Sequence, residues 1–306
     1  MNLMNNLCNS TSLTGKVMFG VFLFALGVNS APAQNPSPKR VLVVSTTMGF
    51  RHSSIPTAEK IIGELAKQSG TFTVDYARIE PNDPQFKSEG GKPDAAKVKA
   101  AMTEVLAEKM SVAALQKLDA VIFANTTGNL PLPDPQGFID WIKSGKGFVG
   151  MHSATDTFPA FRPYIEMIGG EFKNHGAQVE VTAINQDAQC SACRHLPGNW
   201  TVFDEIYLLK NFDRAKVHGL LTLDKHPNDK TPGDFPIAWR KDYGQGRVFY
   251  TSLGHREDIW DAQWKDNKGE RKNTPAVAEA YQKHILGGIH WALGLEQGDA
   301  KPKAAQ

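Results

Sequence analysis

Short hydrophobic runs alternate with longer stretches of helical spacing in the first half of the chain. Nearly every position is apolar in the runs 41–45, 120–124 and 147–151, as in strands that a parallel sheet buries on both faces. A further strand is predicted at 72–76, where apolar and polar residues alternate. Helices are predicted at 53–66, at 94–110 with a continuation toward 118, and at 138–143. This order of elements predicts a parallel sheet with helices on both faces.

The second half is richer in strands. Strand-like segments occur at 179–182, 206–209, 219–223, 238–240 and 247–250. The last two flank Asp242–Gly246, whose residues are typical of a hairpin turn. A final helix is predicted at 274–293, with Thr274 as its cap and Pro275 in its first turn. The predicted fold is therefore α/β, with a mostly parallel sheet flanked by helices and an antiparallel extension in the second half.

The N-terminal residues have the pattern of a secretory signal peptide. Lys16 precedes an apolar run at 17–28, shorter than the ~20 residues that span a bilayer. Ala31-Pro32-Ala33 follows as a small-residue cleavage pattern. We expect a signal peptide at 1–33, a linker at 34–38, one domain at 39–295 and a flexible tail at 296–306. The protein is then periplasmic or secreted, without stable membrane insertion; an uncleaved membrane anchor is the alternative.

Composition and charge narrow the class of partner. The 306 residues include 34 Lys and Arg and 32 Asp and Glu, a formal net charge of +2. Hydrophobic residues make up 41% of the chain and charged residues 22%, an ordinary globular balance that excludes a collagen, a coiled coil or long disorder as the main plan. No long run of like charges occurs, so nothing indicates a nucleic-acid partner. The oligomeric state stays open.

Two cysteines remain after the predicted cleavage, in Cys190-Ser191-Ala192-Cys193. In an oxidising compartment we expect them to form a local disulfide with a structural role. Covalent haem would need a histidine directly after the second cysteine, where Arg194 stands. A thioredoxin-like role is disfavoured because the pair lies far from the first strand–helix unit. The role of the 190–197 segment stays open.

Candidate chemistry lies where the predicted parallel strands end. Ligands of open parallel sheets bind at the carboxyl ends of strands. Three such ends carry Gly49–His52, Asn125–Gly128 and Gly150–Asp156. We expect these three polar loops to meet at one edge of the sheet. His152 occupies the place where an elbow-type hydrolase has Ser or Cys, so an acyl-enzyme mechanism is disfavoured and glutamine amidotransfer is excluded.

Further polar residues extend this predicted site. His175 follows the Gly169-Gly170 turn, and His255 follows the predicted strand at 247–250. Three histidines (His152, His175 and His255) together with Asp156 or Glu205 could ligate a divalent metal. No HExxH motif or helical pair of ligands supports this, and without a metal the same groups could act as general acid and base.

Taken together, the motifs resemble those of the ThuA-like (trehalose utilisation) family. The resemblance covers about residues 40–293 and rests on five stretches in order. They are Gly49–His52, Gly150–Asp156, Gly169–His175, Asp204–Tyr207, and Pro236–Trp239 with Gly244–Arg247 and Thr251–His255. It implies a flavodoxin-like sheet similar to that of class I glutamine amidotransferases, without their nucleophile. Family members are linked to sugar use, often beside dehydrogenases that oxidise a sugar hydroxyl to a ketone.

The resemblance implies a small carbohydrate substrate, either a keto-sugar or a keto-glycoside. A base could remove the proton next to the ketone and so cause isomerisation, or elimination or hydrolysis of the glycosidic bond. The predicted catalytic residues are His52, His152, Asp156 and His175, with His152 or His175 as the base. The predicted substrate-binding residues are Arg51, Glu205, Tyr207, Trp239 and His255. A carbohydrate-binding or scaffold domain without catalysis is the alternative.

Overall fold

A computed structural model describes residues 37–302 of the chain. The predicted signal peptide and its cleavage site lie outside these residues and stay predictions. Within 37–302, no helix is both long and apolar enough to cross a membrane.

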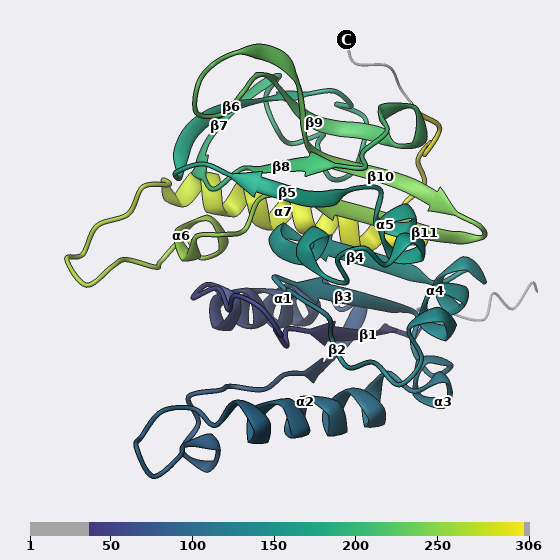
Figure 1. Ribbon diagram of the computed structural model, residues 1–306. Helices are drawn as coiled ribbons and strands as arrows, with labels where there is room; N and C mark the ends of the chain where they lie inside the picture. Colours follow the sequence, from purple (N-terminus) through teal and green to yellow (C-terminus); the bar gives the residue numbers. More distant parts are fainter. Residues whose placement is uncertain (1–36, 303–306) are drawn as a thin grey trace, which may run out of the picture. The chain divides into compact units, whose positions relative to one another are not determined.

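One large mixed sheet dominates the fold (Figure 1). In the described residues it has nine strands, in the order β2-β1-β3-β4-β11-β10-β9-β6-β7. The first five run parallel, with β11 pairing beside β4. Their bounds are Lys39–Val44 (β1), Phe72–Ala77 (β2), Ala120–Ala124 (β3), Gly147–Met151 (β4) and Gly246–Thr251 (β11). This is the 2-1-3-4-5 order of flavodoxin-like sheets, which confirms the predicted α/β fold and brings the ends of β1, β3 and β4 together.

The remaining strands form the predicted antiparallel extension. They are Val179–Asn185 (β6), Asn199–Asp204 (β7), His218–Lys225 (β9) and Pro232–Tyr243 (β10). The β10–β11 hairpin turns at Gly244, which has a φ of 63°, a conformation that glycine adopts without steric cost. A separate antiparallel pair, Glu171–His175 (β5) and Tyr207–Lys210 (β8), lies beside this half of the sheet (Figure 1).

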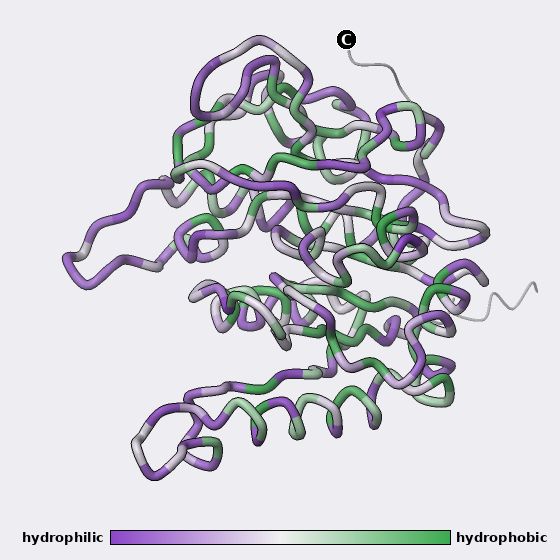
Figure 2. Tube along the Cα trace, in the orientation of Figure 1, coloured by the Kyte–Doolittle hydropathy of each residue, from purple (hydrophilic) through white to green (hydrophobic). Residues whose placement is uncertain are grey.

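Helices cover both faces of the sheet. Their bounds are Ile55–Ser69 (α1), Ala95–Lys109 (α2), Val112–Leu115 (α3), Pro135–Lys143 (α4), Arg162–Ile168 (α5), Glu257–Trp260 (α6) and Pro275–Ala292 (α7). One hydrophobic core joins α1, α6 and α7 to the sheet, and a second joins α2 to α5 to its other face. Figure 2 shows hydrophobic residues concentrated along the central strands and hydrophilic residues in the long outer loops.

Two predicted elements differ from the structure. The second helix ends at Lys109, because Ser111 takes an extended conformation and caps the separate α3. The strand predicted at 206–209 begins at Tyr207 (β8), and Glu205 and Ile206 form a break between it and β7, which ends at Asp204. In the predicted tail, His218 Nδ1 lies 2.8 Å from the carbonyl oxygen of Lys301, and Ala300 is buried; the flexibility of the tail stays a prediction.

Candidate functional site

His152 follows β4 directly and is fully buried. Its φ is 46°, a left-handed conformation that is uncommon for a residue with a side chain and frequent at functional sites. Its Nδ1–H donates to the carbonyl oxygen of Ser252 at 2.8 Å. Because a carbonyl only accepts, this bond fixes the proton on Nδ1 and leaves the lone pair on Nε2.

Two further histidines face that lone pair. The Nε2 atom of His152 lies 3.2 Å from Nε2 of His52 and 3.3 Å from Nδ1 of His255. His52 lies in the loop after β1, and its Nδ1 is 3.3 Å from the hydroxyl of Ser153. His255 lies in the loop after β11. The ends of three parallel strands therefore supply three imidazoles to one point, which is the convergence that the sequence predicts for His52 and His152.

Glu205 adds a carboxylate to these histidines at the break between β7 and β8. Its Oε1 lies 3.3 Å from Nδ1 of His255 and 3.8 Å from Nε2 of His152. Its Oε2 lies 3.0 Å from Nδ1 of His175, at the end of β5. Glu205 therefore joins the buried histidines to His175, whose side chain is 43% exposed.

Asp204 holds the loop that carries His255. Its buried carboxylate accepts hydrogen bonds from the backbone N–H groups of Gly254, His255 and Arg256, at 2.7, 3.3 and 3.2 Å. Gly254 has a φ of 125°, which L-residues with side chains rarely adopt. Burial raises the pKa of Asp204 to about 6, although these backbone bonds act in the opposite direction. A loop that needs such an acceptor can be recognised in the structure but not in the local sequence.

The electrostatics keep the inner histidines neutral. Burial, followed by the charge of His255, lowers the pKa of His52 to about 4. Burial, followed by the charges of His52 and His255, lowers the pKa of His152 well below its ordinary value. Burial also lowers the pKa of His255, but the hydrogen bond and charge of Glu205 outweigh it, so that this pKa is raised. Neutral imidazole is the form that binds metal ions.

The donor set fits a divalent transition metal. One ligand atom each from His52, His152, His255 and Glu205 lies within 4.8 Å of the others. Three imidazole nitrogens and one carboxylate oxygen are ligands that suit zinc and similar ions. The lone pair of His152 points at other imidazole nitrogens, an arrangement that a shared cation would stabilise. We name these four residues the histidine cluster. It adds His52 and leaves out His175, whereas the predicted ligands were His152, His175 and His255 together with Asp156 or Glu205.

Of the other predicted site residues, Tyr207 lies beside the histidine cluster and Asp156 has no hydrogen bond to it in the part of the chain that the structure describes. The Tyr207 ring lies beside the cluster, with its centroid 4.4 Å from that of His152, and burial raises its pKa, which favours the neutral phenol. Asp156 is half-buried, and burial with the charge of Glu171 raises its pKa against the effect of Lys210. Among the described residues no hydrogen bond joins Asp156 to the cluster, so its predicted catalytic role stays a prediction.

Arg51 and Trp239 do not point into the site. The guanidinium of Arg51 donates to the carbonyl oxygen of Ser45 at 3.1 Å and to Glu80 at 3.0 Å. Trp239 is 0% exposed, and its indole N–H donates to the carbonyl oxygen of Ile168 at 2.8 Å. The predicted sugar-stacking role of Trp239 is therefore wrong, because the core covers its ring. Local sequence does not reveal which face of a strand an aromatic residue occupies.

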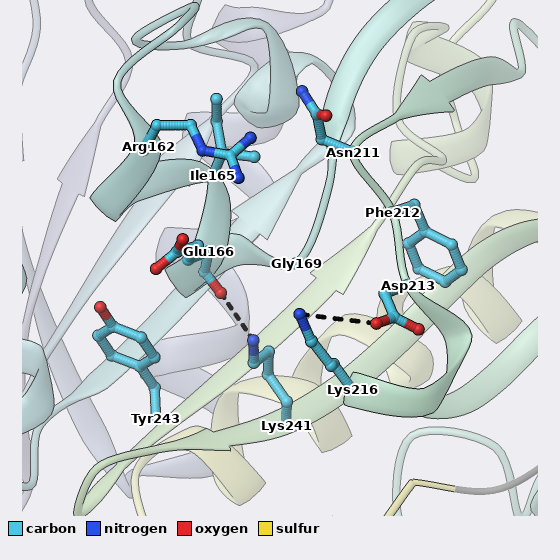
Figure 3. A pocket seen from close by; sticks show the side chains of 10 residues that line it. All are labelled: Arg162, Ile165, Glu166, Gly169, Asn211, Phe212, Asp213, Lys216, Lys241 and Tyr243. Carbon is cyan, nitrogen blue, oxygen red and sulfur yellow. Dashed lines mark hydrogen bonds and ion pairs between the residues drawn. The ribbon is translucent and has the colours of Figure 1, made fainter.

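A hollow of about 490 Å³ adjoins the cluster through Tyr207. Asn174, Leu209, Asp234 and Phe235 are among its other lining residues. A different hollow of about 520 Å³ lies between α5 and the start of β9 (Figure 3). Its two lysines have local partners: the Lys241 ammonium donates to the carbonyl oxygen of Glu166 at 2.6 Å, and Lys216 lies 3.6 Å from Asp213. Neither hollow is lined by a member of the histidine cluster, but the first is lined by Tyr207, whose ring lies beside His152, and the second is not. We therefore place the functional site at the strand ends.

Cys190 and Cys193 lie away from the histidine cluster. Both are buried free thiols in this structure, so the expected disulfide is not formed here and stays a prediction for the oxidised protein. Their turn packs on α7, where the Ser191 hydroxyl donates to the carbonyl oxygen of Gly287 at 3.1 Å.

Comparisons with known proteins agree with this architecture. A ThuA-like protein from Parabacteroides merdae superposes with a TM-score of 0.59 at 18% identity, covering 84% of this chain and 90% of its own. A ThuA-like protein from Bacteroides uniformis gives a TM-score of 0.58 at 17% identity, covering 86% of this chain and 95% of its own. At such identity these likenesses support the fold alone. No curated protein matches this chain.

Family assignment rests on the sequence. The family model ThuA, described as trehalose utilisation, matches residues 40–292, which include every member of the histidine cluster. The span agrees with the resemblance carried by the five motifs, and the chain therefore belongs to the ThuA family.

Proposed function

We propose that this protein is a metal-dependent enzyme that acts on a keto-sugar or keto-glycoside. It removes a proton next to the carbonyl and thereby isomerises the sugar or cleaves its glycosidic bond by elimination or hydrolysis. The observation that carries this proposal is the convergence of three imidazoles and one carboxylate within 4.8 Å, at the strand ends of a parallel sheet. The signal-peptide pattern of residues 1–33 supports a site of action in the periplasm or outside the cell.

His52, His152, His255 and Glu205 would hold the metal. A divalent ion bound there supplies a Lewis acid that polarises a carbonyl oxygen and stabilises the negative charge of an enolate. The hydrogen bond from His152 Nδ1 to Ser252 supports this role, because it orients the ring and keeps Nε2 free for the metal.

His175 with Glu205 supplies the acid–base pair. Nδ1 of His175 donates a hydrogen bond to the carbonyl oxygen of Gly176 at 2.9 Å and lies 3.0 Å from Oε2 of Glu205. The bond to the carbonyl leaves Nε2 of His175 as the basic nitrogen. The exposed ring of His175 exchanges protons with solvent. The base takes the proton from the carbon beside the carbonyl, and the electron pair moves onto the carbonyl oxygen. In elimination this pair then forms a carbon–carbon double bond as the glycosidic oxygen leaves with a proton.

The hollow beside Tyr207 supports a sugar-sized substrate. Its volume of about 490 Å³ lies in the usual range of small-molecule sites. Phe235 offers an apolar surface, while Asn174, Lys173 and Asp234 offer donors and acceptors for hydroxyl groups. Such a mixture suits a carbohydrate, which has apolar ring faces and polar edges.

Deuterium exchange tests the proposal directly. Purified protein, before and after chelation and metal re-addition, is incubated in D₂O with a disaccharide bearing one ketone and with its unoxidised parent, and NMR follows both. We expect deuterium at the carbon beside the ketone, and isomerised or cleaved product, only with the oxidised sugar and bound metal. The His290→Gln variant is the control, since His290 contacts Thr71 instead of the cluster. Tight binding of sugars without exchange or product would contradict the enzyme and favour a carbohydrate-binding domain.

A further inference from the structure

A second cluster of chemically reactive side chains lies in the antiparallel half of the sheet. Cys190 and Cys193 occupy a turn between β6 and β7, in which the N–H of Cys193 donates to the carbonyl oxygen of Cys190 at 2.9 Å. Their exposed fractions are 3% and 0%. This pair is separate from the histidine cluster, and its chemistry does not depend on the proposed enzyme function.

Arg240, on β10, directs a buried positive charge at the first sulfur. Its Nη1 donates to Sγ of Cys190 at 3.1 Å, and its Nη2 donates to Asp187 at 3.2 Å. Among the described residues its Nε has no hydrogen-bond partner, although Arg240 is only 2% exposed. Asp187 also accepts from Nε2 of His218 at 2.9 Å. Since a guanidinium stays charged and Asp187 is shared between two donors, a thiolate at Cys190 complements the remaining charge.

The two sulfurs differ in access. A cavity of about 530 Å³ is lined by Cys190, Arg240 and His218, and by Gly298 and Lys301 of the C-terminal segment. Cys193 is not among its lining residues. The sulfur that contacts Arg240 is therefore also the one that a small molecule could reach.

We propose that Cys190 and Cys193 form a redox-active dithiol, in which Arg240 holds Cys190 as the thiolate that reacts with a small organic disulfide in this cavity. The Cys190 thiolate attacks one sulfur of the disulfide, forms a mixed disulfide and releases one small thiolate. Cys193 then loses its proton and attacks the Cys190 sulfur, which releases the second small thiolate. The released groups take up protons from solvent and from Cys193. In sum, one dithiol and one small disulfide become one protein disulfide and two small thiols.

The electrostatics of the pair agree with this direction of attack. A hydrogen bond from Cys193 and the charge of Arg240 lower the pKa of Cys190, against the effect of burial. The hydrogen bond to Cys190 and burial raise the pKa of Cys193. The other charged or titratable groups that line the cavity are Asp187, His218, Asp299 and Lys301. Carboxylate-bearing disulfides suit Arg240 and Lys301, so oxidised glutathione is the probe and the uncharged bis(2-hydroxyethyl) disulfide its matched control.

Trapping of the mixed disulfide tests the order of attack. The reduced, folded Cys193→Ser variant is mixed with oxidised glutathione, and the modified peptide is identified by mass spectrometry, which also separates the pair from Cys8. We expect one glutathione on Cys190, and none on Cys193 in the matched Cys190→Ser variant. In the wild type, reduced glutathione should remove the disulfide again, and the uncharged control should react at least several-fold more slowly than oxidised glutathione. A folded Cys193→Ser protein that stays unmodified overturns the proposal.

The role of Arg240 has its own test. Alkylation of Cys190 by iodoacetamide is followed from pH 5 to 9 in the wild type and in the Arg240→Met and Arg240→Lys variants. We expect about tenfold slower alkylation at pH 7 in Arg240→Met, and partial recovery in Arg240→Lys. If the variants do not fold, the wild-type profile decides. A rate that rises only above the pKa of a free cysteine, about 8.5, overturns the proposal. A Cys190–Cys193 disulfide in the wild type that dithiothreitol cannot reduce would also overturn the proposal, because it would be a structural crosslink.

Discussion

The segment that follows β11 contributes to two polar clusters, through His255 in its loop and through Asp258 in α6. The two clusters satisfy their polar atoms in opposite ways. At His255, imidazole nitrogens of His52 and His152 face one another, and Glu205 is the carboxylate that they share. Three residues further on, Asp258 has a full set of donors.

The donors to Asp258 come from side chains and backbone. Arg256 donates two hydrogen bonds to its carboxylate, at 2.9 and 3.0 Å, and the Asn273 amide donates one at 3.0 Å. The backbone N–H groups of Lys272 and Asn273 add bonds at 2.6 and 3.1 Å. A buried charge that is fully hydrogen-bonded holds a fold together. In the histidine cluster, by contrast, imidazole nitrogens and a carboxylate face one another, and such groups are the ligands that a metal cation binds. The comparison therefore distinguishes a residue with a structural role, Asp258, from one with a proposed functional role, His255, within one short segment of the chain.

Removal of a cluster ligand gives the largest expected effect on function. We expect His152→Ala and Glu205→Gln each to lose the bound metal and about a hundredfold or more of turnover, since even the loss of a group that only orients a ligand costs about 10–100-fold. The free energy of unfolding of the metal-free protein should change little or rise, because like groups no longer face one another. Metal analysis and denaturant unfolding measure the two quantities. Full metal content in either variant would remove these residues from the ligand set.

Removal of the Asp258 carboxylate should lower stability and leave metal binding unchanged, the reverse of what is expected for a cluster ligand. Asp258→Ala leaves Arg256 without its partner and three donors unsatisfied, so we expect the free energy of unfolding to fall by about 3 kcal/mol or more. The folded fraction should still bind metal with unchanged stoichiometry, because Asp258 is not a ligand. Urea unfolding and metal analysis provide the check, with His290→Gln as the control. Metal loss in folded Asp258→Ala protein would break the comparison.

His284 sharpens the comparison, because it is a buried histidine with both ring nitrogens bonded inside the fold. Nδ1 lies 2.8 Å from the carbonyl oxygen of Ala192, and Nε2 lies 3.3 Å from the Thr251 hydroxyl. Burial lowers its pKa to about 4, below the ~6.5 of an unfolded chain. The unfolded state therefore takes up the proton first, so the contribution of His284 is complete above pH 6.5 and is lost as the pH falls toward 4.

The loss attributable to His284 is about 3 kcal/mol over that interval. Denaturant unfolding at pH 7, 5.5 and 4.5 should therefore show a less steep decline for His284→Gln than for the wild type, whatever its stability at pH 7. Equal slopes would mean that the buried ring already carries a proton in the folded state, contrary to its environment.

The parallel half of the fold could be predicted because its signal is local. Continuous apolar runs locate β1, β3 and β4, and the handedness of strand–helix–strand units brings their ends to one edge. The place of β11 could not be predicted in this way. The hairpin turn at Gly244 locates both of its strands, but the parallel pairing of β11 with β4 joins segments about a hundred residues apart. That pairing carries His255 to the site.

The candidate site could also be predicted only in part from the sequence. His52 and His152 follow from the strand-end rule, since each comes directly after a buried run. Glu205 was named from its position in a family motif, but an uninterrupted strand would not have aimed it at three histidines. The break between β7 and β8, and the Asp204 carboxylate that holds the facing loop, depend on tertiary contacts. Trp239 fails for a related reason, because burial of an aromatic ring depends on what packs over it.

The smallest expected effect belongs to His175, which touches Glu205 from outside the cluster. His175→Ala removes an exposed ring that is not a metal ligand, so metal content and stability should stay within error of the wild type. If His175 is the base, turnover falls at least about tenfold, the lower range for loss of a positioned base, while KM changes less. His175→Gln keeps a polar side chain beside Glu205 but cannot accept a proton at neutral pH, so it should be as slow as His175→Ala. Steady-state kinetics on the keto-disaccharide, with the metal content measured on the same samples, makes the check. Wild-type turnover in both variants would assign the proton transfer to another group and leave His175 as a rim residue, whereas joint loss of metal and turnover would move it into the ligand set.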